Sequence, residues 1–425
     1  MKQTSKVLTF AAASAIVLAA CATPRAPAAP AGGAAPAAPA TSAPATTAPQ
    51  ATDTPAAAAA APQATDTPAA APATEAPKAT EVASITTQSG ELTKVKLVLQ
   101  WVVQSQFAGY FAALDKGFYK DEGLDLSIVP GGPDVSNSQV VASGQAEFGV
   151  GWLPGKMLAP REAGAKLVNI AQIFQRSGTL MVSFKDKNIT SPKDFKGKNV
   201  GSWLGGNEPE LFAAMRKANV DPDKDAKIIQ QGFDMSQLVK GDVDVAQAMI
   251  YNEYAQVLET KNDKTGKLYQ PDDLNVINLS AEGTGMLQDG IMAREDWLAD
   301  AKNQDIAVKF LRASFKGWMY CRDNFDECAQ IVLNNGSALG ESHMKWQLNE
   351  INGLIWPSPA GIGLMDEGLY KTTVDIAKTY GVLKKDPDAG AYRTDLAKKA
   401  LEGLQGDTKG ANFKKVTVEL KEGGS

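Results

Sequence analysis

Four aromatic side chains occupy similar places in the sequence, each after an apolar run long enough for one strand. Trp101, Trp152 and Trp203 each follow such a run, and Tyr251 follows another. Side chains at the carboxyl ends of strands in an open α/β sheet face the crevice outside the sheet, not the helix layers. Flat aromatic faces bind a flat ring well, because stacking adds to the surface that is buried. The pattern therefore indicates a binding site for a flat heterocycle.

Uncharged polar residues accompany these aromatics. Amide side chains can both donate and accept hydrogen bonds, which suits ring carbonyl and imino groups. Those near the same expected edge are Gln100, Gln104, Gln172, Gln175 and Asn207. Taken singly, each aromatic or amide is explained equally well by core packing or by a solvated loop. Taken together, they predict a ligand site made of Trp101, Gln104, Tyr110, Trp152, Gln175, Trp203, Asn207, Tyr251, Asn252 and Glu253.

Residues for catalysis are scarce. The only histidine, His343, lies outside the expected strand edges, and we expect it at the surface or packed on a helix. No Ser/His/Asp arrangement, metal-ligand cluster or phosphate-binding loop can be assembled, so we expect no catalytic residues, no metal and no cofactor. The glycine-rich run 201–206 is either a turn whose N–H groups face a polar ligand atom or a plain tight turn. Lys156, Arg161 and Arg176 could engage an anion, but such residues are more often surface charges.

The elements that must position these residues recur at regular intervals. Residues 94–132 read as one βαβ unit, with a strand, a helix carrying Phe107, Tyr110, Phe111 and Leu114, and a second strand. Such units favour a parallel sheet. The expected strands are 95–100, 124–129, 146–151, 167–174, 180–184, 199–203, 226–230, 243–250, 274–279 and 289–293. Helices carrying Trp297, Phe310, Phe315, Trp318 and Tyr370 should pack on the outside of the first lobe.

Two lobes are expected, because roughly 330 residues are too many for one small core. We expect residues 94–182 and 288–425 in lobe one and 183–287 in lobe two. Two crossings between α/β lobes make a hinge and place a ligand in the cleft between them. The fold class is therefore α/β, with a two-lobed architecture of the type II periplasmic-binding-protein kind.

The first ninety residues are of a different character. Residues 1–20 carry Lys2, Lys6 and a short apolar run, as a secretory signal does, and the run Leu18–Ala19–Ala20–Cys21 resembles a bacterial lipobox. Cys21 is then the lipidated residue of a membrane-anchored, extracytoplasmic protein; the alternative is an ordinary secretory peptide with an incidental cysteine. Residues 21–93 are rich in Ala, Pro and Thr and indicate a disordered linker, either a tether or sequence without a length requirement.

The other two cysteines form an even pair. Cys321 and Cys328 are seven residues apart, which on a straight helix would separate them by about 10 Å, beyond disulfide reach. The turn-like residues 323–326 between them favour a bend, so we expect a disulfide over two free buried thiols in an oxidising compartment.

Several motifs resemble a known family. They are Gln100–Trp101, residues 109–113, the run KGFYKDEGLD at 116–125, VVASGQAEFG at 140–149 and SPKDFKGK at 191–198. They keep the order seen in NMT1/THI5-like solute-binding proteins, and the resemblance covers residues 94–383. It implies an importer receptor that closes around a ligand and delivers it to a permease with ATPase subunits. It also implies ligand contacts near Trp101, Trp203 and residues 251–253.

The resemblance leaves several ligands open: thiamine pyrimidine precursors, riboflavin, and small anions such as alkanesulfonates. Pyrimidine binders of the family carry a histidine soon after the first tryptophan, and residues 102–107 contain none. Anion binders have no need of three cleft tryptophans, so we expect riboflavin, between Trp101 and Trp203. Some intracellular members make the thiamine pyrimidine with pyridoxal phosphate and a reacting histidine, and the export signal argues against that activity. A net charge of −5 gives no case for nucleic acid.

Overall fold

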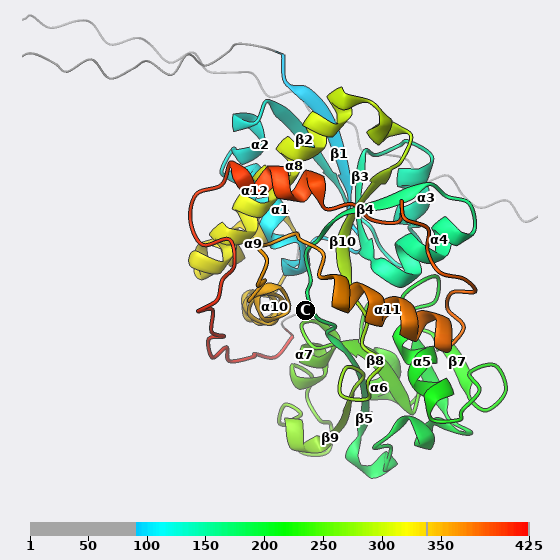
Figure 1. Cartoon of the computed structure of the whole chain (residues 1–425). Coiled ribbons are helices and arrows are strands. Elements are labelled where there is room, and N and C mark those ends of the chain that lie inside the picture. The colour runs from blue at the N-terminus through cyan, green and yellow to red at the C-terminus, as the bar shows by residue number, and fades with distance from the viewer. Residues whose placement is uncertain (1–90, 337–338, 424–425) are drawn as a thin grey trace, which may run out of the picture. The chain divides into compact units, whose positions relative to one another are not determined.

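The structure is a computed structural model that describes residues 91–336 and 339–423 (Figure 1). The expected signal, Cys21 and nearly all of the expected linker lie outside the described residues. The strands are β1 (Thr93–Val98), β2 (Leu124–Val129), β3 (Phe148–Trp152), β4 (Leu167–Gln172), β5 (Thr179–Phe184), β6 (Asn199–Ser202), β7 (Lys227–Gln230), β8 (Val245–Met249), β9 (Leu274–Asn278) and β10 (Asp289–Arg294). Each lies within a residue or two of an expected strand.

Helices connect and cover these strands. They are α1 (Ala108–Asp115), α2 (Phe118–Asp121), α3 (Asn137–Ala142), α4 (Ala159–Glu162), α5 (Pro209–Lys217), α6 (Ser236–Lys240), α7 (Glu253–Leu258), α8 (Ala301–Asp323), α9 (Phe325–Asn335), α10 (Glu341–Ile355), α11 (Glu367–Thr379) and α12 (Asp395–Glu402). Short turns precede α1 and follow β3: η1 (Ser105–Phe107) and η2 (Leu153–Leu158). None of the described helices combines the length and apolar run that a membrane crossing needs.

Two five-stranded sheets form two lobes. The first has the order β2-β1-β3-β10-β4 and the second β7-β6-β8-β5-β9. Lobe one here means the elements around the first sheet, and lobe two those around the second. In both lobes one strand after a crossing runs against the others: β10 is antiparallel to β3 and β4, and β5 to β8 and β9. The expectation of a parallel sheet is therefore wrong for these two strands, and both sheets are mixed.

The first crossing comes earlier than expected. All of β5, from Thr179, pairs within the second sheet, whereas a boundary after residue 182 would divide this strand. The chain returns to lobe one as β10 begins at Asp289, close to the expected position. Both sheets lie in one compact unit of the chain.

The core of lobe one depends on close contact between α1 and α8. A Cβ on Gly317 would lie 2.0 Å from the carbonyl oxygen of Gly109, and a Cβ on Gly109 would overlap the ring of Trp318. Only glycine allows backbones to approach so closely. Phe310 from the same helix stacks on Phe148 of β3 at a centroid distance of 4.0 Å, so α8 also covers the sheet.

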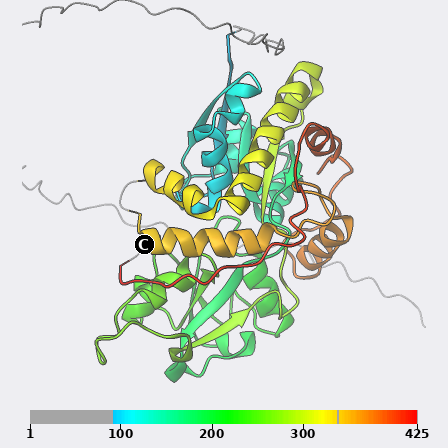
Figure 2. The ribbon, with the colours of Figure 1, turned by 90° about the vertical axis from the view of Figure 1, so that its left-hand side faces the viewer.

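The helix α10 and the residues after α12 connect the lobes. Figure 2 shows the last residues running along α10. Residues 404–423, called the strap below, contain no helix or strand. Val416 exchanges two 2.9 Å hydrogen bonds with the side chain of Asn349 on α10. Beyond it, Glu422 lies 2.6 Å from Lys261 of lobe two. Residues 288–425 therefore do not belong to lobe one alone.

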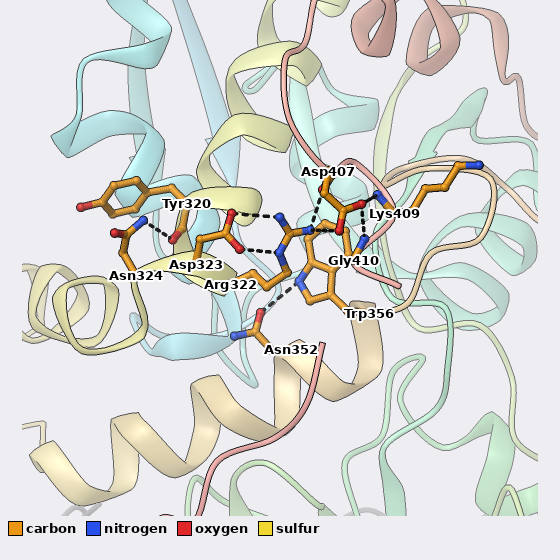
Figure 3. A network of polar contacts seen from close by, with 9 residues as sticks. All are labelled: Tyr320, Arg322, Asp323, Asn324, Asn352, Trp356, Asp407, Lys409 and Gly410. Atoms are coloured by element: carbon orange, nitrogen blue, oxygen red, sulfur yellow. Dashed lines mark hydrogen bonds and ion pairs between the residues drawn. The ribbon is translucent and has the colours of Figure 1, made fainter. Parts of the chain in front are cut away.

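Arg322 anchors the start of the strap (Figure 3). Its Nη1 donates to the carbonyl of Asp407 at 2.6 Å, and its guanidinium lies 4.6 Å from the ring centroid of Trp356. The carboxylate of Asp407 accepts from the next turn of backbone, at Lys409 and Gly410. Arg322 thus holds a hydrogen-bonded turn against a buried indole.

The expected bend between the two cysteines is present. The helix α8 ends at Asp323 and α9 begins at Phe325, with Asn324 between them. This brings the Cα atoms of Cys321 and Cys328 to 5.0 Å, and the two sulfurs form a disulfide.

Candidate functional site

A buried cavity lies where the strand ends of the two lobes meet. Trp101 follows β1 closely and Trp152 ends β3, while Trp203 and Tyr251 follow β6 and β8 of lobe two. The lining residues are Gln100, Trp101, Gln104, Gln106, Trp152, Trp203, Asn207, Met249, Tyr251, Asn252 and Glu253. Strand ends of both lobes therefore line this cavity.

Eight of the ten residues predicted for the site line this cavity. Tyr110 does not: it is buried in α1 with its ring 5.7 Å from that of Trp318. Gln175 is also elsewhere, because it lines a separate cavity of about 390 Å³ at the crossing and donates to the carbonyl of Gln172. Gln106 and Met249 line the cavity and were not singled out from the sequence.

The tryptophans do not stand as two parallel faces. The rings of Trp101 and Trp203 are 6.1 Å apart at an angle of 70°, edge to face. Phe233, which is 51% exposed, covers Trp101 from outside at 5.5 Å. The cavity encloses about 30 Å³, room for a water molecule or two. In this closed arrangement the predicted sandwich is absent, and a flat ring could enter only if the lobes separated.

Two glycines bring the lobes into direct backbone contact beside the cavity. A Cβ on Gly155, in η2, would lie 1.9 Å from the carbonyl oxygen of Gly206 in lobe two. Gly206 itself has a φ of 110°, which disfavours any other residue. Next to this contact, Nζ of Lys156 donates to the carbonyl of Gly205 at 2.8 Å. Residues 201–206 therefore form a turn that also packs closely against lobe one.

A chain of amides connects the cavity to α10. Gln104 donates to Oε1 of Gln106 at 2.7 Å, and Gln106 donates to Asp289 at 2.9 Å. The backbone N–H of Gln106 donates to Oε1 of Gln347 at 3.2 Å, and Nε2 of Gln347 donates to Oδ1 of Asn252 at 2.7 Å. One side chain of α10 therefore bonds a cavity residue from each lobe.

His343 is a helix-packing residue that sits one step behind the cavity. It is 1% exposed, with Nδ1 2.9 Å from Oε2 of Glu259 and Nε2 2.8 Å from Oδ1 of Asn252. Its link to the site could not be predicted from the sequence, because α10 follows no strand. Its partner Asn252 was predicted as a ligand residue and does line the cavity.

The charged groups around the cavity are acidic. Burial raises the pKa of Glu253, which lines the cavity, to about 7, although its carboxylate accepts from the backbone N–H of Met249 and from Asn252. Burial likewise raises the pKa of Asp289 to about 7, held back by Gln106 and by the indole of Trp152. No lysine or arginine lines the cavity. Small anions therefore find no partner charge here.

Some polar atoms of the site have no protein partner. Oδ1 of Asn207 is buried and accepts no hydrogen bond within residues 91–336 and 339–423. In the same part of the chain, no group of His, Cys, Asp and Glu residues could hold a metal ion. A buried acceptor without a partner is destabilising on its own, and Oδ1 of Asn207 is therefore available to a hydrogen-bond donor in the cavity.

Two mixed α/β sheets joined by two crossings, with a cavity at their strand ends, define the periplasmic-binding-protein fold. The aliphatic sulphonate binding protein SsuA of Escherichia coli shares it, with a TM-score of 0.52 at 15% identity over 75% of this chain and 95% of that one. At this identity the likeness shows the fold alone.

The chain belongs to the NMT1/THI5-like family, whose model matches residues 104–328. The riboflavin-binding protein RibY of Chloroflexus aurantiacus is 25% identical over 310 residues, 69% of this chain and 83% of that protein. The formylaminopyrimidine-binding protein of Halalkalibacterium halodurans is 23% identical over 243 residues, 57% of this chain and 70% of that protein. Other relatives are named as 4-amino-5-hydroxymethyl-2-methylpyrimidine phosphate synthases.

Proposed function

We propose that this protein is the solute-binding component of an ATP-driven importer and captures riboflavin when its lobes close. The observation that carries the proposal is the cavity itself. Trp101 and Trp152 from lobe one and Trp203 and Tyr251 from lobe two surround one small space. Aromatic walls contributed by both lobes suit a flat ring system that is buried on both faces, and binding proteins of this architecture close around their ligands.

The polar lining favours a neutral ligand with ring carbonyl and N–H groups. Oε1 of Gln104 and Nε2 of Gln100 make no hydrogen bond among the described residues, and Oδ1 of Asn207 has no partner either. These atoms offer one donor and two acceptors, and an isoalloxazine ring carries both kinds of group. The similarity to a riboflavin-binding protein over most of both chains supports the same ligand class.

A thiamine pyrimidine precursor is the alternative ligand, supported by the similarity to a formylaminopyrimidine-binding protein. The histidine-free segment 102–107 counts against it, since the resemblance implies a histidine there. Small sulfonate or nitrate anions are disfavoured by the absence of lysine and arginine from the cavity lining. An enzyme of pyrimidine synthesis is the least supported alternative, because both ring nitrogens of His343 are held by Glu259 and Asn252.

The proposal includes a place in the cell. Cys21 would carry the lipid that holds the protein to the outer face of the cell membrane, and the linker would let the domain reach a permease and its ATPase subunits. The lobes must open to admit a ring, because the present cavity holds only a water molecule or two.

Titration with riboflavin tests the ligand. Full-length protein purified without refolding should quench flavin fluorescence on binding, because an indole against the ring quenches its emission, and it should appear yellow if ligand is retained. Parallel calorimetric titrations with formylaminopyrimidine and with methanesulfonate compare the alternatives. Heat and quenching with riboflavin alone would support the proposal, whereas binding of the pyrimidine without riboflavin would replace it.

A further inference from the structure

The amide group of Asn252 is held from three sides, and its hydrogen bonds fix the way it faces. Nδ2 donates to Oε1 of Glu253 at 2.6 Å, while Oδ1 accepts from Nε2 of Gln347 at 2.7 Å and lies 2.8 Å from Nε2 of His343. Oδ1 can only accept, so Nε2 of His343 must carry a hydrogen and donate it. The orientation of a cavity residue therefore depends on one tautomer of the histidine.

The contact of the other ring nitrogen then sets the protonation state of the pair His343 and Glu259. Nδ1 of His343 lies 2.9 Å from Oε2 of Glu259, and both side chains are buried. With Nε2 protonated, this contact needs one more proton, either on Nδ1 of an imidazolium or on a neutral Glu259. If that proton leaves, a lone pair faces a carboxylate. Moving the ring hydrogen to Nδ1 relieves the repulsion but leaves Nε2 with a lone pair against Oδ1 of Asn252.

Charged groups on the neighbouring elements leave this pair isolated. Glu259, which follows α7, contacts the ring, and Glu253 of α7 lies behind Asn252. A charge on His343 would lower the pKa of Glu253, against the larger effect of burial. On α9 and α10, Asp326 and Glu341 both pair with Lys345, and from the strap Lys415 pairs with Glu350. The turn η1 presents Ser105, which bonds Met344, and Gln106. Glu259 is therefore the ionisable partner of the histidine.

Gln347 connects the Asn252 amide to lobe one by hydrogen bonds. It is fully buried, and its Oε1 accepts a hydrogen bond from the backbone N–H of Gln106. The side chain of Gln106 lines the cavity and accepts a hydrogen bond from Gln104. Reversal of the Asn252 amide would present an NH₂ group to Nε2 of Gln347, donor against donor. The amide chain across both lobes would then be broken at its centre.

We propose that His343 and Gln347 are positioning residues for the ligand site, and that the proton held between His343 and Glu259 keeps the Asn252 amide in its binding orientation. Ligand affinity then falls as rising pH removes this proton. The inference rests on the proposed function only for the probe, riboflavin.

A spectrum of the ring tests the first half without any ligand. The chain has a single histidine, so full-length protein labelled with ¹⁵N-histidine and carrying no polyhistidine tag gives one imidazole signal set. Near neutral pH, Nε2 should carry hydrogen, and Asn252→Ala should shift that signal. As the pH is raised from neutral to alkaline, the hydrogen should move to Nδ1. An Nδ1–H tautomer near neutral pH, or a tautomer unchanged over the whole range, overturns the inference.

Binding tests the second half. Riboflavin affinity should weaken about tenfold when the ring hydrogen moves, since one hydrogen bond between the ligand and the site is lost. His343→Gln keeps a donor for Asn252 but cannot titrate, so its affinity should vary less with pH than that of the wild type, with only the contributions of Glu253 and Asp289 remaining. Gln347→Met should bind about tenfold more weakly than the wild type at every pH. Glu341→Gln, a control on the same helix, should titrate like the wild type. An equal slope in wild type and His343→Gln refutes the mechanism. No riboflavin binding at any pH refutes the proposed ligand, and the tautomer measurement then decides the inference alone.

Discussion

Replacing Gly155 by alanine should hold the lobes apart. The new Cβ would lie 1.9 Å from the carbonyl oxygen of Gly206, with the carbon and Cα of that residue at 2.6 and 2.7 Å. All three are backbone atoms, so no side chain can rotate out of the way. Because real Cβ atoms essentially never come closer than 3.0 Å, the two segments must recede by about 1 Å.

The effect should appear in closure and not in folding of either lobe. Overpacking of this size typically costs about 1–3 kcal/mol, which corresponds to riboflavin binding about tenfold to hundredfold weaker. Gly155 has a φ outside the left-handed region, so alanine adds no backbone strain at this site. The melting temperature should therefore change little, because each lobe keeps its own core.

Calorimetry with riboflavin measures the loss of affinity, and small-angle scattering of the ligand-free protein measures opening as a larger radius of gyration. Gly232→Ala is the matched control: this glycine lies in lobe two, where its carbonyl accepts from the indole of Trp203, and a Cβ there meets nothing within 4 Å. If Gly155→Ala scatters and binds like the wild type, the backbone contact does not limit closure and the reasoning is wrong.

Three further predictions concern the ligand, the anchor and the crossing. Trp101→Ala or Trp203→Ala should weaken riboflavin binding by about 1–3 kcal/mol through lost stacking and buried area, measured by fluorescence titration; undiminished affinity in both would remove the aromatic clamp. Cys21→Ser should move the protein from the membrane to the soluble fraction, and unchanged fractionation would rule out a lipid anchor. Glu210 of α5 accepts hydrogen bonds from Ser177 and Met286, which lie next to the two crossings. Burial raises the pKa of Glu210 to about 7, so the free energy of unfolding falls as pH rises from about 4.5 to about 7. Glu210→Gln should flatten this slope in urea titrations at about pH 5 and about pH 8, and an unaltered slope would contradict the assignment.

The strands were predictable because each is a short run of β-branched and apolar residues between turn signals. Strand direction was not. β10 has the same composition whether it pairs parallel or antiparallel, and only the crossing from lobe two sets its direction. The boundary at β5 was missed for a related reason: Thr179–Phe184 is buried along almost its whole length, so nothing in its pattern says which sheet it joins.

The lining of the cavity could be predicted from the sequence where a side chain follows a strand, but not elsewhere. Trp101, Trp152 and Trp203 could be placed by this rule, and all three line the cavity. Tyr110 lies outside the cavity, because it belongs to α1 and its ring packs against that of Trp318. The roles of His343 and Gln347 depend on α10 crossing between lobes, and the spacing of apolar residues on a helix shows which face is buried but not which neighbour covers it.

The strap turns the two lobes into a tethered pair. The strap contacts α10 at Val416 and Glu259, which follows α7, at Gly423. These two points are seven residues apart, a length of about 25 Å when the chain is fully extended. Its contacts with lobe two, at Lys261 and Glu259, must therefore slip or break before the lobes swing wide. Thr93 of β1 lies in lobe one, and Lys261, the partner of Glu422, lies in lobe two. Energy transfer between dyes attached beside these two residues would therefore report the distance between the lobes, and with it their opening and closing.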